Sequence, residues 1–144
     1  MEAWNYANLW ESVAAAIPQK PAFIHGDRQI LWGDFDRRAN ANAKRLLDAG
    51  LIRQSKVGAF LYNGPEYLEA YFAAFKAGLT PFNTNYRYGG EELTYLFDNA
   101  DAEAVVFHSG FASVIDRIRA NLTKVKLWLA VPEPSHPVPA WAED

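Results

Sequence analysis

From residue 57 onward, short apolar runs alternate with longer amphipathic stretches, and this alternation constrains the fold more than any other feature of the sequence. We expect strands in four runs, residues 57–62, 79–82, 103–107 and 125–131. The first run is apolar throughout, which is typical of a strand buried on both faces. Strands that alternate with crossover helices form parallel sheets with right-handed connections. We therefore predict an α/β fold, a layered parallel sheet with helices on both faces; an antiparallel sheet would contradict this prediction.

The stretches between these runs carry helix start and stop signals. Pro65 stands where a helix can begin without losing a backbone hydrogen bond, and Gly78 can end the same helix. A second helix is expected at residues 91–99, and Ser109 is expected to cap a third with its hydroxyl group. These three helices are the predicted crossovers of the sheet.

The region before the sheet predicts a helix, a hairpin and a second helix. Apolar residues recur at helical spacing over residues 8–17. Two short apolar runs flank a Gly-Asp turn at residues 26–27, as in a β-hairpin. A longer helix is expected to begin near Gly33 and to end at Gly50, which can adopt a left-handed conformation. We therefore expect the sheet to be preceded by a helix and a β-hairpin.

Residues 132–144 differ in composition from the rest of the chain. Prolines stand at positions 132, 134, 137 and 139, which is typical of a surface loop or linker. The last expected strand runs directly into this segment, so the sheet is expected to be unfinished. We expect residues 1–131 to form the first subdomain of a larger domain, and residues 132–144 to be a Pro-rich loop or linker to a missing remainder.

The composition of the chain excludes several classes of protein. Half of the residues are hydrophobic and 22% are charged, a balance that can bury a sizeable core. The net charge of −3 argues against nucleic-acid binding, which needs a basic surface. The absence of cysteine excludes disulfides, thiolate catalysis and zinc sites built on cysteine. No apolar run approaches the roughly 20 residues that span a bilayer, and the N-terminus does not resemble a signal peptide. We expect a cytoplasmic protein without a transmembrane segment.

Residue types that carry chemistry are present, but their spacing is not that of a known site. The three histidines, His25, His108 and His136, lie in a turn, at a strand end and in the Pro-rich segment. They show no H-E-x-x-H or other paired spacing, so no metal site is expected. Ser109 follows a buried strand but lacks the G-x-S-x-G frame of a nucleophile, so a helix cap is the better interpretation.

The acidic and glycine-rich positions also lack a functional frame. Asp98, Asp101 and Glu103 do not have the alternating ligands and central glycine of a calcium loop, and we interpret them as a solvated connection. The double glycine at residues 89–90 leads into two glutamates, which would repel a phosphate. The aromatic residues in the middle of the chain mostly have helix-core spacing, which favours packing over ligand binding. The residues alone therefore predict no catalytic, cofactor-binding or metal-binding residue.

One segment is more specific than any of these patterns. Residues 67–88 read YLEAYFAAFKAGLTPFNTNYRY, with a Lys-Ala-Gly helix end, an extended step to a proline and an Asn-Tyr-Arg turn. An LWGDF helix opening at residues 31–35 and a YNGPEY turn at residues 62–67 precede it. Together, over residues 8–128, these motifs resemble the N-terminal region of the adenylate-forming superfamily, and most of all its acyl-CoA synthetases, the fatty-acid–CoA ligases. At Leu31 and at residues 89–90 the family often has Thr and Thr-Pro, and both departures remove a helix cap.

This resemblance implies an ATP-dependent acid–CoA ligase acting on fatty or related acyl acids. In such enzymes the acid attacks ATP to give an acyl-adenylate, and the CoA thiol then displaces AMP, so the intact protein is expected to use ATP, Mg²⁺ and CoA. The family has its phosphate loop, its adenine and ribose contacts and its catalytic lysine later in the chain, and none of these matches a position here. The resemblance thus implies an N-terminal scaffold fragment that binds none of these cofactors and is inactive alone.

The expected partners follow from the same resemblance. They are the remainder of the fragment's own chain and a small-molecule carboxylic acid, and a homodimer is an open alternative. Two other functions also stay open at this point: an amino-acid-adenylating relative, and a non-catalytic, stand-alone α/β interaction module. For residues 83–87 we expect a structural role, in which the Asn and Arg side chains bind backbone groups of the turn. The alternative is that Arg87 contacts a phosphate.

Overall fold

The computed structural model describes residues 5–144. The α-helices of this part of the chain are α1 Tyr6–Ala16, α2 Trp32–Asp48, α3 Pro65–Lys76, α4 Gly90–Asn99 and α5 Ala112–Ile118. The strands are β1 Pro21–His25, β2 Arg28–Leu31, β3 Lys56–Phe60, β4 Thr80–Asn83, β5 Ala102–His108 and β6 Leu127–Val131. Two short 3-10 helices, η1 Ser109–Phe111 and η2 Arg119–Asn121, flank α5. Each predicted helix and strand is confirmed, with ends that differ by a few residues.

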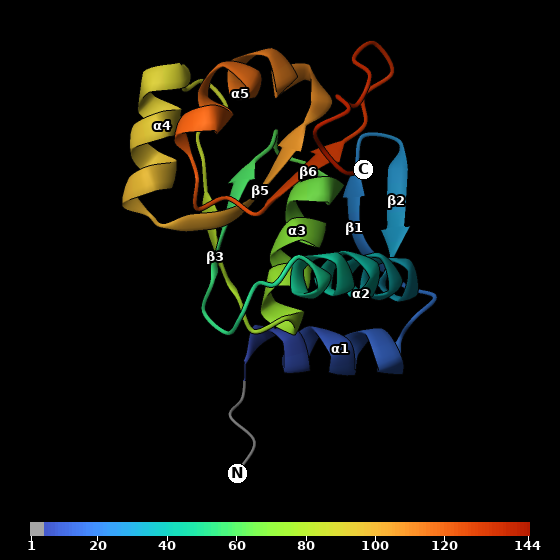
Figure 1. Ribbon diagram of the computed structural model, residues 1–144. Coiled ribbons are helices and arrows are strands. Elements are labelled where there is room, and N and C mark those ends of the chain that lie inside the picture. Colours follow the sequence, from blue (N-terminus) through green and yellow to red (C-terminus); the bar gives the residue numbers. More distant parts are fainter. Residues whose placement is uncertain (1–4) are drawn as a thin grey trace.

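The main sheet is parallel, as predicted (Figure 1). Its four strands lie in the order β4-β3-β5-β6. Val57 in β3 pairs with Pro81 of β4 on one side and with Ala104 of β5 on the other. β1 and β2 form a separate antiparallel hairpin, which follows α1. The prediction of an α/β fold preceded by a helix and a hairpin is confirmed.

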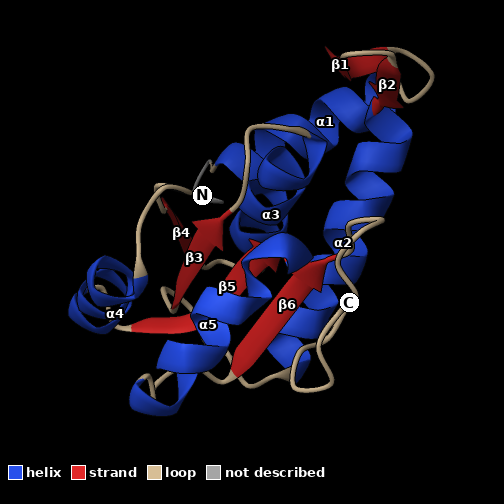
Figure 2. Cartoon of the chain, turned by 90° about the horizontal axis from the view of Figure 1, so that it is seen from above, coloured by secondary structure: helices blue, strands red, loops and turns tan. Residues whose placement is uncertain are grey.

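Helices cover both faces of this sheet. Successive strand residues point to opposite sides, and apolar side chains on each side pack against helices. Val57, Ala59 and Leu129 pack with α2 and α3 on one face. Phe60 and Phe107 pack with α4 and α5 on the other. In Figure 2 the two helical layers lie on either side of the strands. Burial on both faces explains why β3, β5 and β6 are mostly apolar instead of alternating with polar residues.

Two glycines are required for different reasons, one by close packing and one by its backbone conformation. A Cβ atom at Gly58, in the middle of β3, would lie 2.9 Å from Cε1 of Phe97 and 3.1 Å from Cζ of Phe82. The missing side chain thus leaves the space in which α4 packs on the centre of the sheet. Gly50 ends α2 with a φ angle of +83°, in the left-handed region where glycine is favoured, as the sequence predicts.

An aromatic cluster joins α1, the hairpin, α2 and α3 into a third core. Phe35 of α2 lies at its centre, with ring centroids 4.9 Å from Phe72, 5.1 Å from Phe23 and 5.6 Å from Trp10. Such tilted and edge-to-face arrangements are the preferred geometry of aromatic pairs. These aromatic residues of the helices thus serve packing, as their spacing indicates.

Lys76 adds an electrostatic connection to the same three helices. Its ammonium group, at the end of α3, lies 2.6 Å from Oε1 of Glu11 on α1 and 2.8 Å from Oδ1 of Asp36 on α2. It also lies 4.5 Å from the centroid of the Phe72 ring. The Lys76 side chain is only 6% exposed, so its charge depends on these contacts for its solvation.

The Pro-rich segment returns to the sheet and packs along β6. Glu143 accepts a hydrogen bond from the Ala130 N–H at 2.6 Å and donates one to the Trp128 carbonyl at 3.0 Å. The Trp141 ring stacks on Phe107 at a centroid distance of 5.6 Å. Residues 132–144 form no helix or strand, and the proposed boundary at residue 131 stays a prediction.

Helix caps differ from one crossover helix to the next. The prediction that Ser109 caps a helix is wrong, because its hydroxyl donates to the His136 carbonyl at 2.6 Å and accepts from the Glu133 N–H at 2.9 Å. Gly89 lacks a capping side chain, as expected, but its N–H donates to the Glu92 carboxylate at 2.6 Å. Across the described helices, none is long and apolar enough to cross a bilayer.

Candidate functional site

The order of the strands places a topological switch point between β3 and β5. β3 is followed by α3 and β4 on one side, and the chain then crosses to β5 on the other side of β3. Because α3 and α5, which follow β3 and β5, pack on opposite faces, the loops after these strands diverge at their carboxyl ends. Open α/β sheets bind their ligands at such a point. The topology therefore selects this edge as the first candidate site.

His108 and Tyr62 meet at the switch point. Tyr62 follows β3, and its backbone N–H donates a hydrogen bond of 3.2 Å to Nδ1 of His108, the last residue of β5. Burial lowers the pKa of the His108 imidazole below its usual 6.5, although Glu133 and Glu66 act in the opposite direction. The hydrogen bond from the Tyr62 N–H needs the Nδ1 lone pair, so this geometry is that of the neutral ring with its proton on Nε2.

Aromatic rings surround this hydrogen bond, and we call the group the carboxyl-edge cluster. Its members are Tyr62, Tyr86, His108 and Phe111. The Tyr62 ring centroid lies 5.2 Å from that of Tyr86, 5.2 Å from His108 and 4.8 Å from Phe111. Tyr62 is 43% exposed and Tyr86 is 37% exposed. The cluster thus presents two tyrosine rings to solvent above a buried histidine.

The turn over residues 83–87 holds Tyr86 in the cluster. The Asn85 side chain accepts a hydrogen bond of 3.0 Å from the Arg87 N–H, which is the local tie that Asn favours in turns. The Arg87 guanidinium lies 5.3 Å from the Tyr86 ring centroid. The Asn85 contact supports the proposed structural role of the turn, and the role of Arg87 itself stays a prediction.

Charged side chains border the cluster on two sides. On α3, Glu66 lies 2.8 Å from the Arg28 guanidinium of β2. Burial raises the pKa of Glu66, but hydrogen bonds from its own backbone N–H and from Arg28 outweigh burial and hold the pKa below its usual range. On the Pro-rich segment, the Glu133 carboxylate accepts a 2.6 Å hydrogen bond from the Gly110 N–H. Two carboxylates with fixed partners therefore act electrostatically on His108, and both favour its charged form.

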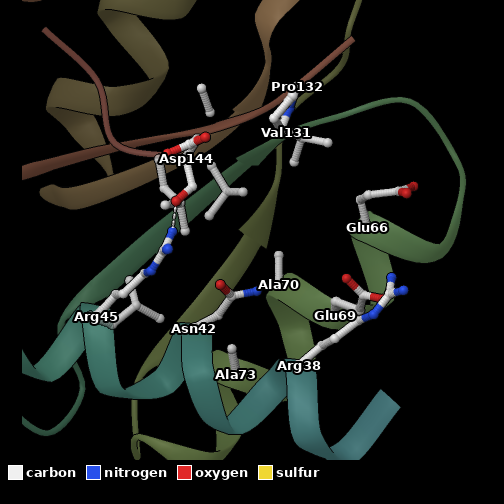
Figure 3. Close-up of a pocket in the computed structure, with 14 residues that line it drawn as sticks. Arg38, Asn42, Arg45, Glu66, Glu69, Ala70, Ala73, Val131, Pro132 and Asp144 are labelled. Carbon is white, nitrogen blue, oxygen red and sulfur yellow. Dashed lines mark hydrogen bonds and ion pairs between the residues drawn. The ribbon is translucent and has the colours of Figure 1, made fainter. Parts of the chain in front are cut away.

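A second candidate site is a groove of about 290 Å³ between α2, α3 and β6 (Figure 3). Ala70 and Ala73 of α3 form part of its floor, and their small side chains leave the space open. Arg38, Asn42 and Arg45 project into it from α2, where they are spaced to share one helix face. The groove is thus an apolar hollow with a polar rim on the α2 side.

Most charges on the groove's rim are paired within the chain. Arg38 lies 3.1 Å from the buried carboxylate of Glu69. Burial raises the pKa of Glu69, although Arg38 acts in the opposite direction. Arg45 donates a hydrogen bond to the backbone carbonyl of Asp144. The groove therefore offers apolar surface without a convergent set of free charges, and the carboxyl edge is the better candidate for a polar ligand.

Metal-binding geometry is not found within residues 5–144. No group of three or more His, Asp or Glu side chains in this range is close enough to hold an ion. The acidic residues 98, 101 and 103 lie at the amino end of the sheet, where Lys124 lies 2.7 Å from Asp101 and Lys126 lies 2.6 Å from Glu103. These pairs are the solvated connection that the sequence indicates.

A family model described as AMP-binding enzyme matches residues 10–142. The chain belongs to the AMP-binding enzyme family. The matched range contains the whole sheet, both candidate sites except Asp144 of the groove, and every motif on which the resemblance to acyl-CoA synthetases rests. That resemblance is therefore confirmed.

Several named relatives of the chain are acyl-CoA ligases. The chain is 33% identical over 92% of its length to the medium-chain acyl-CoA ligase Mig of Mycobacterium avium, of which it covers 26%. It is 35% identical, again over 92%, to a medium/long-chain-fatty-acid–CoA/3-oxocholest-4-en-26-oate–CoA ligase of Mycobacterium marinum, of which it covers 24%. The chain thus spans about a quarter of the length of these relatives.

Solved structures of the family share the fold. Acetoacetyl-CoA synthetase from Streptomyces lividans superposes with a TM-score of 0.87 at 18% identity, over 97% of this chain and 24% of the other. At this identity the similarity shows the architecture only. The parallel sheet with helices on both faces is therefore a family fold, and residues specific to this chain must be interpreted from its own contacts.

The sequence indicated no site residue, and the structure shows why the carboxyl-edge cluster was missed. His108 was interpreted as an isolated strand-end histidine, and Tyr62 is 46 positions away from it. Only the parallel pairing of β3 with β5 brings them together. The available signal was that both residues lie at the ends of buried apolar runs, where parallel strands expose side chains at one edge.

Proposed function

We propose that this chain is the N-terminal scaffold part of an ATP-dependent acid–CoA ligase that acts on fatty or related acyl acids. The observation that supports the proposal is the 33–35% identity to acyl-CoA ligases over 92% of the chain. In the reaction of the longer ligase, the acid's carboxylate attacks ATP and releases pyrophosphate, and the CoA thiol then displaces AMP from the acyl-adenylate. ATP, Mg²⁺ and CoA are therefore proposed for the longer ligase.

We expect no triphosphate site among the described residues. Phosphate binding takes convergent backbone N–H groups, or a metal with its carboxylates, usually with a Lys or Arg clamp. At the double glycine before α4, the Gly89 N–H is already bonded to the Glu92 carboxylate, whose negative charge opposes a phosphate. We therefore propose that residues 5–144 build and support the sheet, while the groups that hold ATP belong to other parts of the ligase.

A two-part experiment tests the proposal. Calorimetry of the 144-residue chain with ATP and Mg²⁺ is expected to show no tight binding. A pyrophosphate-release assay on the longer ligase, with fatty acids and amino acids as a panel, is expected to show CoA-dependent turnover with fatty acids. Micromolar binding of ATP by the chain would refute the scaffold role. Release driven by amino acids instead of fatty acids would refute the substrate class.

The proposed partners are the remainder of the ligase and its carboxylic acid substrate. Exposed apolar side chains, including Tyr95 on α4 and Ile52 before β3, are consistent with contacts to further protein. A homodimer and a cytoplasmic location complete the proposal. Sedimentation of the longer ligase at several concentrations would distinguish a monomer from a dimer.

A further inference from the structure

The hydrogen bond between Tyr62 and His108 connects the two loops that diverge at the switch point. The donor is the backbone N–H of Tyr62, which lies just beyond β3, and the acceptor is Nδ1 of His108 at the end of β5. His108 is only 9% exposed. Withdrawing the acceptor from this part-buried hydrogen bond costs free energy, so the position of the loop after β3 depends on His108.

Only the neutral imidazole can accept this hydrogen bond. Protonation at Nδ1 would place an N–H group against the Tyr62 N–H, so the contact would change from attractive to repulsive. The same protonation would give the ring a positive charge between two carboxylates. Glu66 approaches from α3, where Arg28 of β2 compensates part of its charge, and Glu133 approaches from the Pro-rich segment.

The groups around His108 offer its charged form carboxylate partners in place of the Tyr62 amide. Glu133 is bonded to the Gly110 N–H, two positions after His108 in the chain. The Pro-rich segment is held to the same turn by the Ser109 hydroxyl, through its bonds to residues 133 and 136. His136 of the same segment lies beside the Gly110 position. A charged His108 would therefore move toward the carboxylates and away from Tyr62.

We propose that His108 is the positioning residue of the carboxyl-edge cluster: its neutral ring fixes the Tyr62 backbone and ring, and its protonation releases them. The released state has a mobile Tyr62 and a looser contact between the Tyr62, Tyr86 and Phe111 rings. The exposed tyrosine face of the AMP-binding fold is thus formed at neutral pH and lost in acid. This inference depends on the geometry of the cluster alone and stands whether or not the ligase proposal is correct.

Nuclear magnetic resonance of the isotope-labelled chain between pH 8 and pH 5 tests the proposal directly. The ¹H–¹⁵N signal of the Tyr62 amide and the imidazole signals of His108 are expected to titrate with one shared midpoint, below the usual 6.5. The imidazole ¹⁵N shifts at high pH are expected to show the Nε2–H form. Independent titration of the two residues, or a proton on Nδ1 at high pH, would overturn the proposal without any variant being made.

Three variants separate positioning from a merely structural role. Asparagine places a carbonyl oxygen close to the Nδ1 position, so His108→Asn is expected to retain the neutral-pH Tyr62 amide shift and to abolish its pH dependence. His108→Ala is expected to lose the shift at every pH. His25→Asn, at the exposed end of β1, removes a histidine outside the cluster and is expected to leave the Tyr62 titration unchanged. A pH-dependent Tyr62 shift that persists in His108→Asn would contradict the proposal.

Discussion

Replacement of Lys76 by methionine tests whether a single ammonium group stabilises the arrangement of α1, α2 and α3. The methionine side chain keeps most of the apolar stem but removes the charge that lies 2.6 Å from Glu11 and 2.8 Å from Asp36. It also removes the cation 4.5 Å from the Phe72 centroid. The two carboxylates would then lie near each other without a compensating charge.

The expected loss of stability follows from the exposure of the groups. Both carboxylates are partly exposed, so each ion pair contributes less than a fully buried pair, about 0.5–1 kcal/mol. The cation–π contact adds about 0.5–1 kcal/mol. We therefore expect Lys76→Met to lower the free energy of unfolding by about 1.5–3 kcal/mol. The carboxylate repulsion left behind acts in the same direction.

Urea unfolding followed by tryptophan fluorescence measures this loss, because Trp10 lies in the cluster beside Phe72. Lys44→Met on α2 is the matched control. Lys44 is 75% exposed and pairs only with Asp48, one turn away, so its loss should cost about 0.3–0.5 kcal/mol. If the two variants unfold at the same urea concentration, the three-helix connection contributes nothing and the reasoning is refuted.

Three further predictions concern the core, the groove and acid stability. Gly58→Ala is expected to destabilise the fold by about 1–3 kcal/mol in the same urea assay, because the new methyl group would displace Phe97; an unchanged midpoint would show that α4 can move away freely. Arg38→Met is expected to lower the free energy of unfolding by about 1–3 kcal/mol, because it leaves the buried Glu69 carboxylate without its partner. Glu69→Gln is expected to change that free energy by less than about 0.5 kcal/mol, since the remaining Arg38 can face water. Equal losses in the two variants would contradict this asymmetry. The pKa of His108 is lower in the folded chain than in the unfolded chain, so the unfolded chain binds more protons as the pH falls. The contribution of His108 to stability is therefore complete above pH 6.5 and is lost as the pH falls from 6.5 through the folded-state pKa. If thermal melts of His108→Asn show the same decline in acid as the parent chain, that decline belongs to other groups.

The sheet could be predicted from the sequence because each of its determinants is local. Continuous apolar runs predict the positions of the strands, and Pro65, Gly50 and Gly78 predict helix ends to within a few residues. The parallel direction followed from the helices between the strands. The same local logic failed at Ser109, where a cap was expected, because its actual partners come from residues 133 and 136.

The candidate site could not be predicted because its contacts are long-range. The Tyr62–His108 bond depends on the register of β3 with β5, which no window of the sequence encodes. The docking of the Pro-rich segment depends on Trp141 stacking on Phe107, and a tryptophan among prolines gives no sign of which ring it contacts. Burial of His108 follows from both, so its lowered pKa is a property of the assembled fold.

The strand order has a consequence for how the chain emerges from the ribosome. β3 is the first strand of the main sheet to be synthesised, yet it lies inside the sheet, with β4 on one side and β5 on the other. The backbone of residues 56–60 therefore cannot pair with β4 until residue 83 has been synthesised, or with β5 until residue 108 has been synthesised. Throughout that interval an apolar strand has no neighbour on one edge or both, while the N-terminal helices and hairpin are already available. Synthesis through residues 56–108 is thus the period in which a nascent chain of this kind is most in need of a chaperone.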